Sequence, residues 1–428
     1  MAKPKKQASP FDSHSPDSEI QDIISGSRIL FLVDELEAIT ARGTERQLLQ
    51  MIDICKHGGM HPQVCIFRNT SWLTDEIAGC PVTHFQIGRL GSWKGVRSLM
   101  QLKRWIGEQK FDILQSFSSE ANLVGPCVGR LAGVPVILGT RMSLNHASPD
   151  DPSPRSLRWQ RRMNLLVNQI IASSEAVLEG IVESEKVSRK RICVVYNGVD
   201  LEQMRPSPEL REAARKEFGL EDDHILVGNV SGLSKIKGSQ MFVNAAADAY
   251  RRDPRLRFLL IGDGEMKTQL KQTIRMYGLD GVVGLHRPQK DVLPYLAALD
   301  IGVLCSYTEG FSNSLLEYMA CGVPVIATDV GGNREALGPC GLLIRTEALD
   351  LANAIQLMSV PQTRKDYAAA ALQKVRDFDV SIAREHMMEI YARYLAKGQS
   401  KKRQHTQIVP SIPAHSLKVD EVRDTEAA

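Results

Sequence analysis

Two glutamates, Glu309 and Glu317, stand eight positions apart in a stretch that is dense in polar residues and glycine. Glu309 lies in a loop after an apolar run, and Gly310 lets the main chain of that loop approach another group closely. A short helix is expected next, with Ser312 or Asn313 as its cap and Glu317 within it. The start of such a helix favours a phosphate, so the two carboxylates could bind separate hydroxyl groups of an extended ligand. A capped helix with two surface glutamates fits the local sequence equally well.

A lysine follows another apolar run in the same half of the chain. In NVSGLSKIKG (229–238), Lys237 comes after a strand and a turn of small residues. A lysine in this place, facing a cleft between domains, is suited to hold a diphosphate as a point charge. A solvated surface lysine is the alternative interpretation. The glycine of RGTER (42–46) would bring main chain close to the same cleft, whereas the G-x-G of IGDGE (261–265) is too incomplete for a dinucleotide fingerprint.

The composition is that of a folded globular protein with two or three domains. The chain has 428 residues, of which 43% are hydrophobic and 24% charged, so it is too apolar to be disordered throughout. The net charge of +3 does not indicate nucleic-acid binding. No metal-ligand spacing is present, and the eight cysteines are scattered, which is typical of reduced thiols. With no apolar run near the roughly 20 residues of a membrane span and no signal peptide, we expect a cytoplasmic protein.

Short apolar runs alternate with longer amphipathic stretches along most of the chain. This alternation predicts an α/β fold with parallel sheets that helices cover on both faces. The pattern breaks at MRPSPE (204–209) and restarts, which predicts two Rossmann-like doubly wound domains facing a central cleft. The expected divisions are a disordered leader at 1–26, a first domain at 27–205, a second domain at 206–380, a final helix at 381–397 and a disordered tail at 398–428.

Basic and aromatic residues are interleaved in two stretches of the first half. They are RLGSWKGVRSLMQLKRW (89–105) and RSLRWQRRM (155–163). Such stretches can lie on an anionic membrane, with lysine and arginine at the lipid headgroups and tryptophan at the interface. The alternative is a pair of solvated helix faces on which tryptophan is partly packed.

The order and spacing of these segments resemble those of the retaining glycosyltransferases of family 4, the glycosyltransferase group 1 type, which have the GT-B fold. EGFSNSLLE (309–317) resembles the E-x7-E motif of that family, and ACGVPVIATDVGGNRE resembles the stretch that follows it. LLIGDGE, NGVD (197–200), VGRLAGVPVI (128–137) and RGTERQL also resemble family segments. The resemblance extends over about residues 27 to 397.

The resemblance implies a role for each residue that matches a family motif. Glu309 would contact hydroxyls of the donor sugar, and Glu317 those of the ribose. Main-chain N–H groups at the start of the helix would hold the diphosphate together with Lys237, and main chain at 286–288 would meet the base. The catalytic residues implied are Glu309 and Lys237, and the donor-binding residues are Gly43, Lys235, His286, Arg287, Gly310, Phe311, Ser312, Asn313, Ser314, Leu315 and Glu317.

Two positions depart from the family pattern. Members usually have an arginine five residues before the lysine, where this chain has Gly232, with Lys235 as the only nearby substitute. Members often have a histidine after the strand at DILQSF (112–117), where this chain has Gln115 and Phe117. Besides transfer, the sequence therefore leaves open a catalytically silent nucleotide-binding scaffold, or another GT-B enzyme such as a sugar-nucleotide epimerase.

The function that the resemblance implies is transfer of a sugar, with retention, from a nucleotide-diphosphate sugar to a glycan or lipid-linked acceptor. Such a reaction belongs to polysaccharide or glycolipid biosynthesis. No cofactor or metal ion is expected besides the donor substrate, since cationic protein groups take the place of a metal. The expected partners are the nucleotide sugar, the acceptor and, as a peripheral contact, the inner face of an anionic membrane, with no nucleic acid. The last helix would cross back to the first domain.

Overall fold

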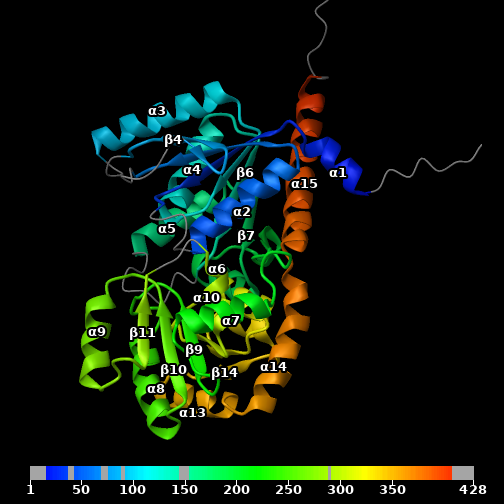
Figure 1. Ribbon diagram of the computed structural model, residues 1–428. Helices are drawn as coiled ribbons and strands as arrows, with labels where there is room; N and C mark the ends of the chain where they lie inside the picture. The colour runs from blue at the N-terminus through cyan, green and yellow to red at the C-terminus, as the bar shows by residue number, and fades with distance from the viewer. Residues whose placement is uncertain are drawn as a thin grey trace, which may run out of the picture.

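The computed structural model describes residues 16–36, 43–68, 76–87, 92–143, 154–287 and 291–406. They form two α/β domains, one above the other in Figure 1, and a long helix, α15 (Val380–Thr406), that runs along one side of both. Both sheets are parallel apart from one short antiparallel pair, as the alternation of strands and helices predicts.

The first domain is built on a sheet of eight strands: β1 (Arg28–Val33), β2 (His61–Ile66), β3 (Glu76–Ile77), β4 (Cys80–His84), β5 (Ile113–Ser116), β6 (Val136–Arg141), β7 (Gln169–Ala172) and β8 (Ile192–Val194). Their order is β3-β4-β2-β1-β5-β6-β7-β8. The helices are α1 (Pro16–Ile24), α2 (Gly43–His57), α3 (Trp93–Gln109), α4 (Ser119–Leu131), α5 (Pro154–Asn164) and α6 (Glu175–Glu185), with a 3-10 turn at Arg189–Arg191. Phe31 of β1 belongs to the core that α15 covers, whereas Leu30 and Leu32 belong to the core beneath α3 and α4. Burial on both faces explains why β1 is apolar at successive positions.

The second domain has a sheet of six strands: β9 (Ile225–Val230), β10 (Leu256–Ile261), β11 (Val283–His286), β12 (Ile301–Leu304), β13 (Val325–Thr328) and β14 (Leu342–Ile344). Their order is β11-β10-β9-β12-β13-β14, so the chain reverses direction across the sheet between β9 and β12. Ligands of doubly wound sheets bind at the carboxyl ends of the strands beside such a reversal. The helices are α7 (Pro208–Glu217), α8 (Ser239–Arg252), α9 (Lys267–Met276), α10 (Leu293–Ala298), α11 (Asn313–Ala320), α12 (Asn333–Leu337), α13 (Ala348–Met358) and α14 (Pro361–Lys374), with a 3-10 turn at Val375–Phe378.

The last helix crosses from the second domain back to the first, as expected. Met387, Ile390 and Leu395 of α15 belong to the same core as Phe31 of β1. The hydroxyl of the fully buried Tyr391 donates to Gln115 Oε1 at 2.7 Å. This helix therefore joins the two domains through apolar packing and through hydrogen bonds to the first sheet.

The ends of the described chain contain more helix than the sequence predicts. The leader at 1–26 is expected to be disordered, but α1 forms within it and packs against α15 (Figure 1). Ile23 and Ile24 follow Ile20 by three and four positions, so one apolar face of this short helix joins the core. α15 continues past the expected boundary at 397, because lysine, glutamine and arginine are good helix formers and extending a helix is easier than starting one. The rest of the expected leader and tail lies outside the described residues.

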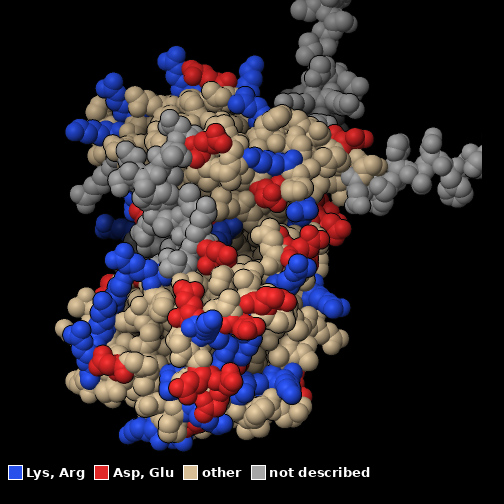
Figure 2. Space-filling view, in the orientation of Figure 1, with Lys and Arg blue, Asp and Glu red and all other residues tan. Residues whose placement is uncertain are grey.

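The surface of the described residues carries charges of both signs. Figure 2 shows lysine, arginine and acidic side chains intermingled over both domains, with basic side chains gathered along the edge over α3. This distribution agrees with the small net charge of the chain. No helix within the described ranges is both long and apolar enough to cross a bilayer.

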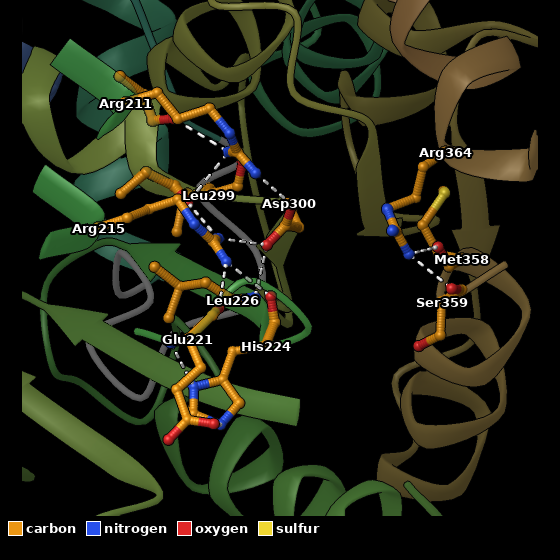
Figure 3. A network of polar contacts seen from close by, with 12 residues as sticks. Arg211, Arg215, Glu221, His224, Leu226, Leu299, Asp300, Met358, Ser359 and Arg364 are labelled. Carbon is orange, nitrogen blue, oxygen red and sulfur yellow. Dashed lines mark hydrogen bonds and ion pairs between the residues drawn. The ribbon is translucent and has the colours of Figure 1, made fainter. Parts of the chain in front are cut away.

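Asp300 ties α7 to the amino ends of β9 and β12 (Figure 3). Its carboxylate accepts hydrogen bonds from Arg211 Nη2 at 2.6 Å, from Arg215 Nη1 at 2.9 Å and from the main-chain N–H of Leu226 at 2.8 Å. A cavity of about 410 Å³ lies beside this cluster, at the amino ends of β9 and β12. Another arginine of its wall, Arg364, donates to the last carbonyls of α13. The arginines of this cavity therefore have structural partners, and we do not assign it a ligand.

The Asp300 cluster yields a prediction for stability. Asp300→Ala leaves two guanidinium groups without their carboxylate partner and the N–H of Leu226 without its side-chain acceptor, so the free energy of unfolding should fall by about 3 kcal/mol. Urea unfolding followed by circular dichroism measures this change. Asp350→Ala, which removes one of two carboxylates that pair with the exposed Arg345, is the matched control and should leave the midpoint nearly unchanged. Equal midpoints for Asp300→Ala and the wild type would contradict the structural role.

Candidate active site at the domain interface

The candidate site lies where the carboxyl ends of the two sheets meet. β9 and β12 are neighbours, so the turn after β9 and the loop after β12 leave the second sheet side by side. The loop after β12 carries Glu309 and leads into α11, whose N-cap is Ser312 and whose C-cap is Cys321. The short helix that the sequence predicts here is confirmed, with Glu317 inside it.

Glu309 and Lys237 form an ion pair, although 72 residues separate them in the chain. Lys237 Nζ lies 2.6 Å from Glu309 Oε1, and the hydroxyl of Ser306 donates to the same oxygen at 3.0 Å. Gly238 has a φ of +68°, and a Cβ atom there would lie 1.9 Å from the carbonyl oxygen of Cys305. Only glycine allows the turn after β9 to touch the end of β12 in this way, and the contact carries Lys237 to Glu309.

Glu317 is buried and meets a residue of the first domain. One of its carboxylate oxygens pairs with Arg46 of α2, and the other, also buried, has no hydrogen-bond partner among the described residues. Burial lowers the pKa of the Arg46 guanidinium below its usual value. A buried acceptor without a donor is costly, and a ligand hydroxyl placed here would satisfy it.

Sequence reasoning missed Arg46. It singled out the segment RGTER (42–46) for its glycine, and Arg46 is the last residue of that segment. The segment was therefore recognised as a candidate, but no local sequence pattern shows that its arginine meets a glutamate 271 residues further along the chain.

Aromatic packing and a hydroxyl group anchor the start of α11. The ring of Phe311 packs against those of Tyr196 and Phe378, with centroid separations of 4.9 and 5.3 Å. The hydroxyl of Ser314 donates to the carbonyl of Val230 at 2.9 Å, which ties the helix to the end of β9. These side chains are engaged within the protein, so they would offer a ligand main-chain groups rather than side-chain groups.

Asn197 of the first domain fastens the same turn from the other side. Its Nδ2 donates to Asn313 Oδ1 at 2.7 Å and to the carbonyl of Phe311 at 3.1 Å. Ser312 is buried and makes no side-chain capping bond, and Leu315 lies in the core of the second domain. The first turn of α11 leaves N–H groups without partners inside the helix, which is the feature that the resemblance assigns to the diphosphate.

The main chain of Gly310 lies against the first domain. A Cβ atom at Gly310 would lie 1.9 Å from the carbonyl oxygen of Met142. Its own carbonyl accepts hydrogen bonds from the hydroxyl of Ser174 at 2.8 Å and from the N–H of Gly332 at 3.0 Å. The sequence predicts a close approach at this glycine, and the structure shows that main chain of the other domain makes it.

The remaining residues that the resemblance implies lie around this junction. Lys235 is exposed on the turn after β9, and Gly43 is the first residue of α2. His286 ends β11, where its carbonyl accepts from the N–H of Gly262 at 3.0 Å and its ring lies edge-on to two aromatic rings. Arg287 follows and is exposed, and 288 lies outside the described residues. The structure brings Lys237, and not Lys235, to Glu309.

The two departures from the family pattern are both accommodated within the fold. Gln115 is buried, and its Nε2 donates to Thr140 Oγ1 at 3.0 Å. The ring of Phe117 lies edge-on to that of Phe31, with centroids 5.5 Å apart. No described side chain comes close to Gly232, where an added Cβ atom would meet only a carbonyl oxygen at 3.9 Å.

Comparison with known proteins identifies the family. The family described as "Glycosyl transferase 4-like domain" matches residues 42–198, and the family described as "Glycosyl transferases group 1" matches residues 221–359. Together the two matches span more than half of the chain, one in each domain. The chain belongs to the group 1 glycosyltransferases. Its two facing parallel-sheet domains are those of the GT-B fold, as the resemblance implied.

Several glycosyltransferases are similar to this chain in sequence or structure. The chain is 28% identical to D-inositol 3-phosphate glycosyltransferase 2 of Catenulispora acidiphila, over 66% of this chain and 71% of the relative. It is 27% identical to UDP-Gal:alpha-D-GlcNAc-diphosphoundecaprenol alpha-1,3-galactosyltransferase of Escherichia coli, over 56% of this chain and 63% of that protein. The crystal structure of Anabaena Alr3699/HepE in complex with UDP-glucose aligns with a TM-score of 0.73 at 25% identity, over 87% of this chain and 99% of the other.

The contact between Gly310 and Met142 yields a prediction. Gly310→Ala places a methyl group 1.9 Å from the Met142 carbonyl oxygen, so the loop or the first domain must move. Such overpacking costs about 1–3 kcal/mol, and the apparent midpoint of thermal unfolding should fall by several degrees. Gly107→Ala is the control, because a methyl group in that part of α3 meets its nearest neighbour at an ordinary 3.6 Å. A midpoint unchanged by Gly310→Ala would mean that the two domains do not touch at this loop.

Proposed function

We propose that this glycosyltransferase moves a sugar from a nucleotide-diphosphate sugar to a glycan or lipid-linked acceptor, with retention of the anomeric configuration and without a metal ion. The observation that carries the proposal is the pair of carboxylate–cation contacts in the cleft, Glu309 with Lys237 and Glu317 with Arg46. A similar structure that contains UDP-glucose supports the donor class. A relative named for a diphosphoundecaprenol-linked acceptor supports an acceptor from polysaccharide or glycolipid biosynthesis.

The geometry of the cleft suits the parts of such a donor. The buried, unpartnered oxygen of Glu317 would accept a hydrogen bond from a ribose hydroxyl. Lys237 and the first-turn N–H groups of α11 would face the diphosphate, while Glu309 would bind hydroxyls of the sugar. In this structure Lys237 pairs with Glu309 and Arg46 pairs with Glu317. With the donor bound, its diphosphate would contact the lysine, and its hydroxyl groups would contact the two carboxylates.

The proposed reaction exchanges one bond to the anomeric carbon for another. The bond from this carbon to the diphosphate oxygen breaks, and a bond from it to the acceptor oxygen forms on the same face of the sugar. Negative charge grows on the leaving diphosphate, so Lys237 and the helix start stabilise the transition state more than the ground state. The departing phosphate oxygen takes the proton of the acceptor hydroxyl, so no side-chain base is required. These cationic groups do the electrostatic work of a metal ion, and the meeting of the two domains would exclude water.

Three variants test the assignment of roles. Glu317→Ala should raise the Kd for UDP by about 10-fold or more, since a charged hydrogen bond contributes roughly 1.5–3 kcal/mol. Lys237→Ala should lower kcat by about 100-fold with a smaller change in KM, because its charge is needed most in the transition state. Glu309→Gln should lower kcat while the affinity for UDP stays close to that of the wild type. The measurements are steady-state transfer kinetics and calorimetric titration with UDP.

The controls separate this function from its rivals. Arg251→Ala, which removes an exposed arginine paired with Asp248 in the last turn of α8, should change neither quantity. If Lys235 supplies the clamp instead, the larger loss of kcat will follow Lys235→Ala. Wild-type kinetics in all three site variants would refute the assignment. A wild-type protein that binds UDP but neither transfers nor hydrolyses any sugar in a panel of nucleotide sugars would instead be a silent scaffold.

We also propose that α3 docks on an anionic membrane. Trp93, Val96 and Met100 lie on one face of this helix and are 82%, 41% and 67% exposed. Trp105, a residue of the same basic-aromatic stretch, is not an anchor, because it packs against the rings of Phe85 and Phe111. The exposed basic residues of the helix are Lys94, Arg97, Lys103 and Arg104.

Vesicle cosedimentation tests the docking. Each basic residue near an anionic surface adds about 1 kcal/mol, and salt screens this attraction. Binding to phosphatidylglycerol-containing vesicles should therefore be detected at low salt and largely lost at high salt, and the double variant Trp93→Ala/Met100→Ala should weaken it. Leu349→Ala removes an exposed leucine of the second domain and is the matched control. Equal binding to neutral vesicles would show a purely hydrophobic contact, and no binding at all would refute the proposal.

A further inference from the structure

A glutamate of the second domain caps a helix of the first. Glu335 in α12 accepts hydrogen bonds from the main-chain N–H groups of Glu175 and Ala176, both at 2.8 Å, with one carboxylate oxygen for each. The hydroxyl of Tyr196 donates to the same carboxylate at 3.1 Å. N–H groups in the first turn of a helix have no acceptor within the helix, and a negative charge there is favoured by the helix dipole. Glu335 thus supplies, from another domain, part of the cap of α6.

The cap adjoins the loop of the candidate active site. Ser174, the N-cap residue of α6, accepts from the N–H of Val177 at 3.1 Å and donates its hydroxyl to the carbonyl of Gly310 at 2.8 Å. Gly332, three residues before Glu335, donates its N–H to the same carbonyl at 3.0 Å. The carbonyl next to Glu309 is therefore held by both domains at once, and the contacts of Glu335 lie immediately beside it.

We propose that Glu335 is a positioning residue that holds the two domains in the arrangement where the Glu309 loop faces the first domain. Burial and the adjacent Glu335 carboxylate raise the pKa of Tyr196 to about 12, so its hydroxyl stays protonated and donates. Three donors of the first domain then converge on one carboxylate of the second. Loss of that carboxylate leaves two helix N–H groups without their acceptor. It also removes the contacts between the domains that lie beside the Glu309 loop. The consequence for catalysis rests on the proposed function, whereas the consequence for domain contact does not.

Hydrogen exchange tests the contact without any substrate. Residue-resolved exchange should show the N–H groups of Glu175 and Ala176 at least tenfold less protected in Glu335→Ala than in the wild type. Glu335→Gln keeps one acceptor oxygen, so it should expose only one of the two. Arg334→Ala is the matched control, since the neighbouring arginine is exposed and pairs with Asp329 of its own domain. Unchanged protection at both positions in both Glu335 variants would overturn the proposal.

Kinetics test the positioning role. Glu335→Ala and Glu335→Gln should lower kcat for transfer at least tenfold while the Kd for UDP stays within twofold, because no donor-binding residue is altered. A role confined to stability would reduce the active fraction and the thermal midpoint together and leave kcat per folded molecule unchanged, which would overturn the positioning role. If Glu335→Ala does not fold, the kcat and the Kd for UDP of Glu335→Gln decide whether Glu335 has the positioning role. A wild type that is inactive with every nucleotide sugar would refute the proposed function, and the exchange result would still decide whether Glu335 joins the domains.

Discussion

The geometry of the cleft depends on the close approach of main chain from the two domains at Gly310. No side chain fits there, because a Cβ atom would overlap the carbonyl of Met142. Gly332 adds a second tight position, where a Cβ atom would lie 2.3 Å from the carbonyl oxygen of Gly310 and 3.0 Å from the Cβ of Ser174. Main-chain contact of this kind cannot adjust as a flexible side chain does, so the loop that carries Glu309 has little freedom while the domains touch.

The two glutamates of the cleft differ in where their cations come from. Lys237 belongs to the same domain as Glu309, so that pair does not depend on how the domains meet. Arg46 belongs to the first domain, so its pair with Glu317 exists only while the domains are together. Burying a charge without a partner is costly, and each of these carboxylates has a cationic partner. A donor that offers hydroxyl groups to the carboxylates and a diphosphate to the cations fits this arrangement of charges.

Periodicity predicts a helix better than it predicts which side of the helix packs. From Trp93 onward the basic-aromatic stretch forms a helix, but its two tryptophans have opposite environments. Trp93 is exposed, whereas Trp105 packs against Phe85, which follows β4, and against Phe111, which follows the helix. The helix at 16–24 is not predicted from the sequence, because three isoleucines among polar residues are too weak a periodic signal. Its apolar face becomes evident only in the structure, where these isoleucines join the core that α15 covers.

The sequence by itself determined the fold class, the two domains, the family and the helix that carries Glu317, because these follow from local periodicity, from capping residues and from motifs within short segments. It also indicated Lys237 and Gly310 as residues with a special task. Only the tertiary structure decided what they touch. Arg46 meets Glu317 across 271 residues, and Glu335 caps a helix 160 residues before it. Such pairs arise from the way α15 and the two sheets set the domains against each other, and no local pattern records that placement.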